Sequence, residues 1–266
     1  MTRPYAEVIG DPIAHSKSPL IHNFWLGRLG IDAEYRACHV RPEELAGYFA
    51  RRRGDTAWRG CNITVPHKVA ALAHVDGLSD AARAIGAINC VVSDSGLLGQ
   101  NTDVAGFLEA LGDRRIDSVT VIGAGGAARA VLAGLASRGV KSVSVQNRSV
   151  AKAEALLAEF GLAGIAVPLG SETPLADLLV NTSSLGMTGQ PDLPPVEAGV
   201  GDGGRVCDIV YAPLETRLLR AARARGLETI DGLAMLIGQA AAAFEQFFGE
   251  PAPRQHDAEL RVLLTA

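Results

Sequence analysis

The chain has 266 residues with 25 Lys and Arg against 29 Asp and Glu, which leaves a formal net charge of −4. Hydrophobic residues make up 48% of the chain and charged residues 20%, a balance typical of a globular protein and unlike that of a disordered one. The mild acidity disfavours a nucleic-acid partner, because nucleic-acid-binding proteins usually carry a strong basic excess. No run reaches the roughly 18 apolar residues that predict a membrane span, so we expect no membrane partner.

The N-terminal segment and the cysteines indicate the cellular compartment in which we expect the protein. Residues 1–7 have no apolar stretch behind their charge, so we expect no signal peptide. The four cysteines (Cys38, Cys61, Cys90 and Cys207) lie far apart without a Cys-x-x-Cys pair, which disfavours a zinc or redox site. We therefore expect no metal, and reduced thiols in the cytoplasm are the simplest interpretation.

Strand-like and helix-like patterns alternate in the N-terminal part of the chain. The predicted strands are residues 5–9, 33–40, 88–93 and 97–100, and the predicted helices are residues 19–29, 42–53 and 66–74. The first helix places Ile21, Trp25 and Leu29 on one face. The other two begin with a proline, which the first helical turn tolerates because its N–H group would be unsatisfied there.

A second alternating set follows. The predicted strands are residues 117–122, 141–146, 178–181, 205–209 and 228–230, and the predicted helices are residues 125–137, 149–160, 213–225 and 233–248. Strands that alternate with helices imply a parallel sheet with right-handed crossovers. The last helix is long and apolar enough to pack on another layer.

A dinucleotide-binding fingerprint, G-x-G-x-x-(G/A), lies at residues 123–128 between a predicted strand and a predicted helix. Gly123 permits the tight turn, and Gly125 lets backbone N–H groups approach a pyrophosphate at the helix N-terminus. Because a second strand follows in register, the pattern favours a cofactor over a merely structural turn.

The end of that second strand indicates which cofactor binds. An NAD site would have Asp or Glu there for the ribose hydroxyls, but this chain has Gln146-Asn147-Arg148-Ser149, with Lys152 one turn later. A guanidinium can bind a 2′-phosphate through two hydrogen bonds, so we expect NADP. The alternative is that these basic residues are merely solvated at the start of a helix. Positive charge near a helix N-terminus is unfavourable unless an anion is bound there.

Three polar clusters precede the fingerprint, at residues 10–19, 62–68 and 86–89, the last of them followed by residues 99–103. In the first, two hydroxyls beside a helix N-terminus suit a carboxylate, although Ser18 could instead cap the helix. In the second, Lys68 is expected at the N-terminus of the helix at residues 66–74, where the helix dipole would disfavour its ammonium form.

Taken together, these motifs resemble the shikimate dehydrogenase family along nearly the whole chain. The matching motifs are H-S-x-S-P at residues 15–19, T-V-P-x-K at 64–68, G-A-x-N at 86–89, N-T-D at 101–103, G-A-G-G-A at 123–127, N-R-S at 147–149 and G-x-x-M-L-x-x-Q-A at 232–240. The resemblance implies a reversible, NADPH-dependent oxidoreductase that reduces 3-dehydroshikimate to shikimate, in chorismate and aromatic amino-acid biosynthesis.

The resemblance also implies an α/β fold of two domains. An N-terminal α/β substrate domain would comprise residues 1–102 and 236–266, and a Rossmann-type, doubly wound NADP domain would comprise residues 103–235. The last helices would thus return to the substrate domain.

Site residues are carried over on the same basis. The catalytic residues would be Lys68 and Asp103. The substrate-binding residues would be Ser16, Ser18 and Tyr211 for the carboxylate, and Thr64, Asn89 and Gln239 for the ring hydroxyls. The cofactor-binding residues would be Gly123, Gly125, Gly126, Ala127, Asn147, Arg148, Ser149, Lys152, Ile209, Gly232 and Met235. Two of these have a plainer alternative, since Tyr211 could merely pack and Met235 could belong to the core.

Other functions on the same scaffold stay open. A quinate or aminoshikimate dehydrogenase would share most of these motifs, and a non-catalytic NADPH-sensing module would share the fingerprint. Quinate-preferring relatives often have Thr at the second serine, and NAD-using relatives have an acidic residue after the second strand; this chain has neither change. We expect a small-molecule substrate and a monomer or homodimer.

Overall fold

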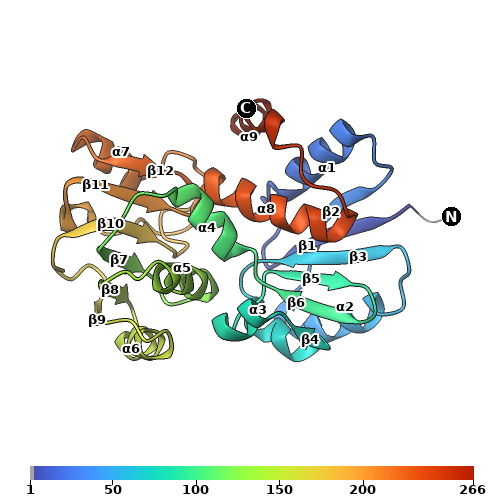
Figure 1. The fold of residues 1–266 in the computed structure, drawn as a ribbon, viewed down its shortest axis with the longest axis horizontal. Coiled ribbons are helices and arrows are strands. Elements are labelled where there is room, and N and C mark those ends of the chain that lie inside the picture. Colours follow the sequence, from blue (N-terminus) through green and yellow to red (C-terminus); the bar gives the residue numbers. More distant parts are fainter. Residues whose placement is uncertain (1–2) are drawn as a thin grey trace. The chain divides into compact units, whose positions relative to one another are not determined.

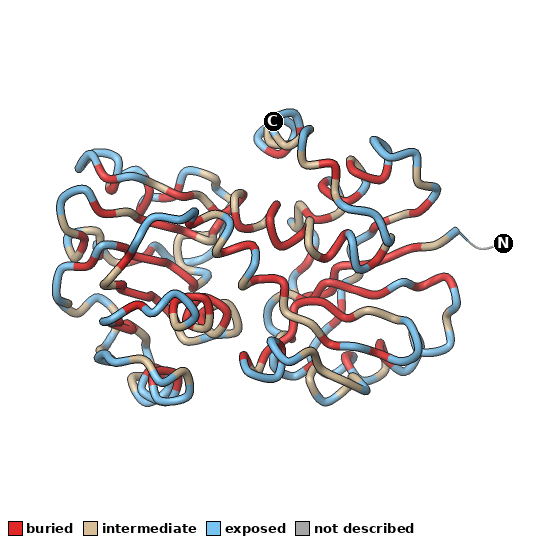
Figure 2. The backbone as a smooth tube through the Cα atoms, viewed as in Figure 1, coloured by how far each residue is buried: buried red, intermediate tan, exposed pale blue. Residues whose placement is uncertain are grey.

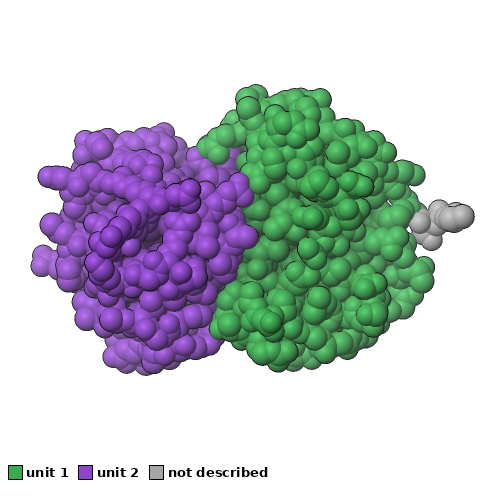
Figure 3. Space-filling model, in the orientation of Figure 1, with its two compact units in different colours: residues 1–103, 237–266 green, residues 104–236 purple. Residues whose placement is uncertain are grey.

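The computed structural model describes residues 3–266 and divides the chain into two compact units (Figures 1 and 3). Unit 1 comprises the chain up to Asp103 together with Ile237–Ala266, and unit 2 is Val104–Leu236. The chain passes between the units inside two helices, α4 (Asp103–Leu111) and α8 (Gly232–Phe248). Residues 1 and 2 lie outside the described part, so the expectation of no signal peptide falls partly on residues that the structure does not describe.

Unit 1 contains a mixed sheet with the strand order β2-β1-β3-β5-β6-β4. Its strands are β1 (Tyr5–Gly10), β2 (Glu34–His39), β3 (Trp58–Ile63), β4 (Gly77–Leu78), β5 (Cys90–Ser93) and β6 (Leu97–Gln100). β1 pairs in parallel with β2 and β3, whereas β5 is antiparallel to both of its neighbours. The prediction missed β3, because Arg59, Gly60 and Asn62 interrupt the apolar pattern of its sequence. In the structure every residue of β3 except Arg59 is nevertheless buried.

The helices of unit 1 cover both faces of this sheet. They are α1 (Ser18–Leu29), α2 (Leu45–Arg52), α3 (Asp80–Ile85), α9 (Asp257–Thr265), the unit 1 part of α8, and the 3₁₀ helices η1 (Pro42–Glu44), η2 (Ala70–His74) and η4 (Arg254–His256). Tyr48 and Phe49 of α2 pack with Ile9 and Ile63 on one face. Ala243 and Phe247 of α8 pack with Ala6 and Val8 on the other.

The predicted helix at residues 66–74 is wrong. Residues 65–69 form turns, and only the short 3₁₀ helix η2 follows them. The Lys68 carbonyl accepts a hydrogen bond from the Ile88 N–H group at 2.8 Å, and the His67 ring bonds the Val40 carbonyl at 2.6 Å. These tertiary bonds replace the helical ones, so Lys68 does not lie at the N-terminus of an α-helix formed by its own segment.

Unit 2 contains an all-parallel sheet with the strand order β12-β11-β10-β7-β8-β9. Its strands are β7 (Ser118–Ile122), β8 (Ser142–Asn147), β9 (Gly164–Pro168), β10 (Ala176–Asn181), β11 (Val200–Asp208) and β12 (Glu228–Ile230). In chain order this is the 3-2-1-4-5-6 arrangement of a doubly wound dinucleotide-binding sheet. The predicted fold class is thereby confirmed, although the exposed edge strand β9 was missed.

Alternating residues on the strands of unit 2 contribute to two apolar cores, and the central strands β7, β8 and β10 are mostly buried (Figure 2). Val119 and Val121 pack with α5 (Gly126–Ser137) and α6 (Val150–Glu159). Leu179 on β10 packs instead with Leu218 and Leu219 of α7 (Arg217–Ala224). It also packs with Val196 and Val200, which flank the 3₁₀ helix η3 (Glu197–Gly199). The period of two along each strand produces this division. Within residues 3–266, no helix combines the length and apolarity that crossing a membrane requires.

Candidate active site

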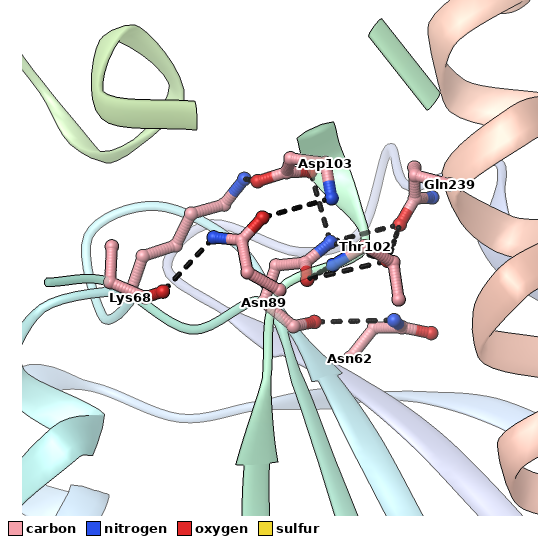
Figure 4. Close-up of polar contacts among 8 residues, drawn as sticks. Asn62, Lys68, Asn89, Thr102, Asp103 and Gln239 are labelled. Atoms are coloured by element: carbon pink, nitrogen blue, oxygen red, sulfur yellow. Dashed lines mark hydrogen bonds and ion pairs between the residues drawn. The ribbon is translucent and has the colours of Figure 1, made fainter. Parts of the chain in front are cut away.

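The Lys68 ammonium and the Asp103 carboxylate form an ion pair in unit 1, with Nζ 2.5 Å from Oδ2 (Figure 4). Lys68 lies in the turns after β3, and Asp103 is the first residue of α4. Their side chains are only 15% and 5% exposed. Two charges are therefore held together in a largely dehydrated place, where an ion pair needs further hydrogen bonds to be stable.

Asn89 supplies these further bonds. Its Nδ2 lies 2.9 Å from Asp103 Oδ1, 2.9 Å from Thr102 Oγ1 and 3.2 Å from Gln239 Oε1. Its Oδ1 accepts from the Thr102 N–H group at 2.7 Å. The structure thus brings together four predicted site residues, Lys68, Asn89, Asp103 and Gln239. It adds Thr102, which the N-T-D motif contains but to which the sequence analysis gave no role.

Asn62 joins the same cluster from β3 and was also given no role. Its Nδ2 donates to the Asn89 carbonyl at 3.2 Å, and its Oδ1 accepts from the Tyr35 hydroxyl at 2.6 Å. Burial raises the pKa of Tyr35 well above its usual value, so this hydroxyl keeps its proton and stays a donor. The orientation of the Asn62 amide follows from that bond.

The paired serines lie at the start of α1. The N-cap residue is Lys17, and Ser18 is already the first helical residue. No side chain caps this helix; instead, Ser16 Oγ accepts the Ser18 N–H group at 3.3 Å. The alternative that Ser18 is a helix cap is therefore wrong, and its hydroxyl has no hydrogen-bond partner within residues 3–266. Lys17 Nζ donates to the Leu264 carbonyl in α9.

Thr64 follows β3 and adjoins the loop that carries the serines. The Asp11 N–H group donates to the Val65 carbonyl at 3.0 Å, which ties the loops after β1 and β3 together. A Cβ atom on Gly10 would lie 2.5 Å from Thr64 Cγ2, so only glycine fits at the end of β1. Ser16 and Thr64 thus lie in adjoining loops at the carboxyl edge of the unit 1 sheet, and Ser18 begins the helix that follows the first of these loops.

In unit 2 the glycine fingerprint has the conformation that a dinucleotide requires. Gly123 has a φ of +103°, and a Cβ atom there would lie 2.9 Å from Thr182 Oγ1. Gly125 is the N-cap of α5, and a Cβ atom there would meet nothing within 4 Å. Gly126 and Ala127 form the first turn of that helix. Its N-terminus therefore stays open to an anion.

Arg148 and Lys152 lie at the start of α6, after β8. Both are exposed, and within residues 3–266 neither has an ion-pair or hydrogen-bond partner. Ser149 is the N-cap without a side-chain cap bond, and Asn147 donates to the Ser149 carbonyl at 2.9 Å. Two unpaired cations beside an uncapped helix N-terminus fit a phosphate group.

The other predicted cofactor residues lie near the carboxyl end of β11 and the start of α8. A Cβ atom on Gly232 would lie 2.4 Å from the Ile209 carbonyl, so this glycine is required by close backbone packing. Met235 is only 6% exposed and packs in the core of unit 2. Tyr211 lies in unit 2, just after β11.

A buried carboxylate that the sequence analysis missed organises this region. Asp208 accepts hydrogen bonds from the Thr216 hydroxyl at 2.7 Å, the Asn181 amide at 2.9 Å and the Val210 N–H group at 3.1 Å. Burial raises the pKa of Asp208, and these three hydrogen bonds oppose the rise. Asp208 thereby connects the end of β10 with the segment that follows β11.

Three family descriptions match the chain. "Shikimate dehydrogenase substrate binding domain" matches residues 8–91, "Shikimate / quinate 5-dehydrogenase" matches residues 108–176, and "Shikimate 5'-dehydrogenase C-terminal domain" matches residues 232–259. The shikimate dehydrogenase (NADP(+)) of Sphingopyxis alaskensis is 55% identical over 267 residues, which cover 99% of this chain and 97% of that protein.

Solved structures agree with this match. Shikimate 5-dehydrogenase from Thermus thermophilus, in complex with NADP(H) and shikimate, has a TM-score of 0.86 at 39% identity and covers 98% of this chain and 99% of its own. Quinate dehydrogenase from Corynebacterium glutamicum, in complex with NAD, has a TM-score of 0.84 at 31% identity, with 98% and 99% covered. Sequence and fold thus agree along almost the whole length, and the chain belongs to the shikimate dehydrogenase family, as its motifs predict.

Proposed function

We propose that this protein catalyses the reversible, NADPH-dependent reduction of 3-dehydroshikimate to shikimate. The observation that carries the proposal is the Lys68–Asp103 ion pair, which Asn89 and Gln239 join in one hydrogen-bonded cluster. The chain is also 55% identical to a shikimate dehydrogenase (NADP(+)). An NADPH-sensing module would need the fingerprint of unit 2 but not this buried, charged cluster in unit 1.

Lys68 and Asp103 are the proposed catalytic residues. Reduction of a ketone builds negative charge on its oxygen, which must gain a proton. NADPH supplies the hydride when it is bound. Lys68 Nζ donates the proton to that oxygen and, in the reverse direction, takes the proton of the substrate hydroxyl. Asp103 Oδ2 holds the ammonium in place, while Asp103 Oδ1 is itself held by the Asn89 amide.

Neutral side chains bind the rest of the substrate. The Ser16 and Ser18 hydroxyls are the proposed ligands of its carboxylate, together with Tyr211. Thr64, Asn89 and Gln239 are the proposed ligands of its ring hydroxyls. The unengaged Ser18 hydroxyl supports the first assignment, and the buried cluster around Asn89 supports the second.

The cofactor would be held by unit 2. Its pyrophosphate fits the open N-terminus of α5 at Gly123, Gly125, Gly126 and Ala127. Its 2′-phosphate fits the region of Asn147, Arg148, Ser149 and Lys152. Ile209, Gly232 and Met235 would lie near the nicotinamide. The proposed substrate domain is residues 1–102 with 236–266, and the proposed NADP domain is residues 103–235.

The second candidate is quinate as substrate, because a quinate dehydrogenase shares the fold at 31% identity. Purified protein is mixed with NADP or NAD and with shikimate, quinate or an amino analogue of shikimate, and the NADPH absorbance is followed. We expect the highest kcat/KM with shikimate and NADP. Higher kcat/KM with another acid would reassign the substrate, and tight NADPH binding without turnover of any acid would favour the sensing module.

The proposal extends to compartment and assembly. Three of the four thiols are buried and the fourth is half-buried, and all are free, which suits a protein acting in the cytoplasm. We propose a monomer or a homodimer, which light scattering of the purified protein would distinguish from larger assemblies.

A further inference from the structure

We propose that Asn101 is a positioning residue that sets the distance between Lys68 and Asp103. This inference rests on the proposed function, in which those two residues carry the proton. Asn101 has no role in the sequence analysis, and within residues 3–266 its side chain bonds neither the Lys68 ammonium nor the Asp103 carboxylate. Its effect is on the backbone that carries them.

Lys68 and Asp103 come from different segments, with no secondary-structure element in common. Lys68 lies in the turns before η2, and Asp103 starts α4. Between them in space lies the segment at residues 86–89. The Ile88 N–H group donates to the Lys68 carbonyl at 2.8 Å, which fastens the lysine backbone to that segment.

Asn101 completes the connection between the two segments. Its Nδ2 donates to the Ala87 carbonyl at 2.9 Å, and its Oδ1 accepts the Asp103 N–H group at 3.1 Å. A continuous path therefore leads from the Lys68 main chain, through residues 87 and 88, to the Asp103 main chain. The Asn101 amide is the side chain that closes this path.

The path needs an amide, since one short planar group must donate on one side and accept on the other. Aspartate would keep the acceptor for the Asp103 N–H group but would lose the donor. It would also bring a negative charge against the Ala87 carbonyl. Alanine would lose both bonds. These two substitutions therefore separate the two halves of the connection.

The connection is distinct from the one that Asn89 makes. Asn89 bonds the Asp103 carboxylate itself, whereas Asn101 bonds the backbone N–H group of the same residue. Asn101 thus fixes where the side chain starts and Asn89 fixes how it points. A displacement of about 1 Å in a reacting group can cost about 10²-fold in rate, so the loss of either bond should be visible in kcat.

The chain offers a matched control in Asn23. Its Nδ2 donates to the Tyr35 carbonyl at 2.7 Å and its Oδ1 accepts the Tyr35 N–H group at 3.0 Å, so it too clamps two segments of unit 1. These bonds join α1 to β2 and contact neither Lys68 nor Asp103. Asn23→Ala therefore reports the cost of losing an amide clamp in general.

The experiment compares wild type, Asn101→Ala, Asn101→Asp and Asn23→Ala with shikimate and NADP at saturation, and records the Tm of each. We expect kcat of Asn101→Ala to fall about 10–100-fold with little change in the shikimate KM. Asn101→Asp should regain most of the lost Tm, because a carboxylate suits the N-terminus of α4, but not kcat. Asn23→Ala should lose Tm and keep kcat near the wild-type value.

Near-native kcat in Asn101→Ala, or an equal loss of kcat in Asn23→Ala, would overturn the inference. A crystal structure of Asn101→Ala tests it without any assay. We expect the separation of Lys68 Nζ and Asp103 Oδ2 to exceed hydrogen-bond range, and an unchanged ion pair would contradict the positioning role. If the wild type does not turn over shikimate, the proposed function fails, and this structural result still decides the positioning role.

Discussion

At the scale of single residues, the ion pair of Lys68 and Asp103 acts as one group. Each charge is largely buried and each is the main partner of the other. Removing one partner leaves the other charge dehydrated and uncompensated, which costs more than the pair itself contributes. The consequences for catalysis should therefore not be additive.

Lys68→Ala should lower kcat by about 10²–10⁴-fold, with a much smaller change in the shikimate KM, because the proton donor is lost. Asp103→Asn should also lower kcat, since the ammonium loses its ion-pair partner. The double variant should be little worse than the poorer single variant, because the two residues act as a unit. Steady-state kinetics of the three variants provide the check, and near-native kcat in Lys68→Ala would refute the assignment.

Arg148 is an exposed cation without a partner in the described chain, so its loss should affect the cofactor and not the fold. A charge-assisted hydrogen bond contributes about 1.5–3 kcal/mol, so Arg148→Ala should raise the KM for NADP by roughly tenfold or more. The KM for NAD, which has no 2′-phosphate, should hardly change. Kinetics with both cofactors measure this, and equal effects on the two would contradict the NADP assignment.

At the scale of elements, the first turn of α1 does not use the Ser18 hydroxyl as a helix cap, which leaves that hydroxyl available to the proposed ligand. The Ser16 hydroxyl accepts the Ser18 N–H group, but the Ser18 hydroxyl accepts no helical N–H group. By contrast, Ser79 caps α3 in the same unit by accepting the Ala82 N–H group at 3.2 Å. Two serines at helix starts therefore have different expected functions.

Ser18→Ala should weaken shikimate binding by about 0.5–1.5 kcal/mol, the contribution of one hydrogen bond, and leave Tm nearly unchanged. Ser79→Ala should do the reverse, lowering the free energy of unfolding by about 1 kcal/mol because a cap is lost. Equilibrium binding and thermal unfolding of both variants test the contrast. A Ser18→Ala variant that loses Tm but binds shikimate normally would place the carboxylate elsewhere.

At the scale of the whole molecule, stability should depend on pH through the buried His22. His22 is fully buried, its ring stacks on Tyr35 at 3.9 Å, and neither ring nitrogen has a hydrogen-bond partner within residues 3–266. Burial lowers the pKa of His22 from 6.5 to about 3. The unfolded chain therefore takes up a proton below pH 6.5 that the folded chain excludes.

The free energy of unfolding should accordingly be highest above pH 6.5 and fall as the pH drops towards 3. For this group the linkage predicts a loss of about 2 kcal/mol between pH 7 and pH 5. His22→Phe keeps an aromatic ring against Tyr35 and should remove that part of the pH dependence. Denaturant unfolding at the two pH values measures it, with the exposed His15→Gln as control. An unchanged pH dependence in His22→Phe would contradict the assignment.

The sequence by itself determined the doubly wound sheet of unit 2, the glycine turn at Gly123 and the family of the chain. These features depend on local patterns, such as alternating apolar residues and a glycine where φ must be positive, so they can be read along the chain. The motifs also named Lys68, Asn89, Asp103 and Gln239 as site residues, and the structure places these four in one hydrogen-bonded cluster.

Only the tertiary structure decided how those residues are held. The expected helix at residues 66–74 is replaced by turns, because Lys68 and His67 bond partners from distant segments. The hydrogen bonds of Thr102, Asp208 and Asn101 could not be predicted either, since each joins groups that folding brings together. A hydrogen bond between segments far apart in the chain leaves no periodic pattern in the sequence. For this physical reason the hydrogen bonds of the site became visible only in the tertiary structure.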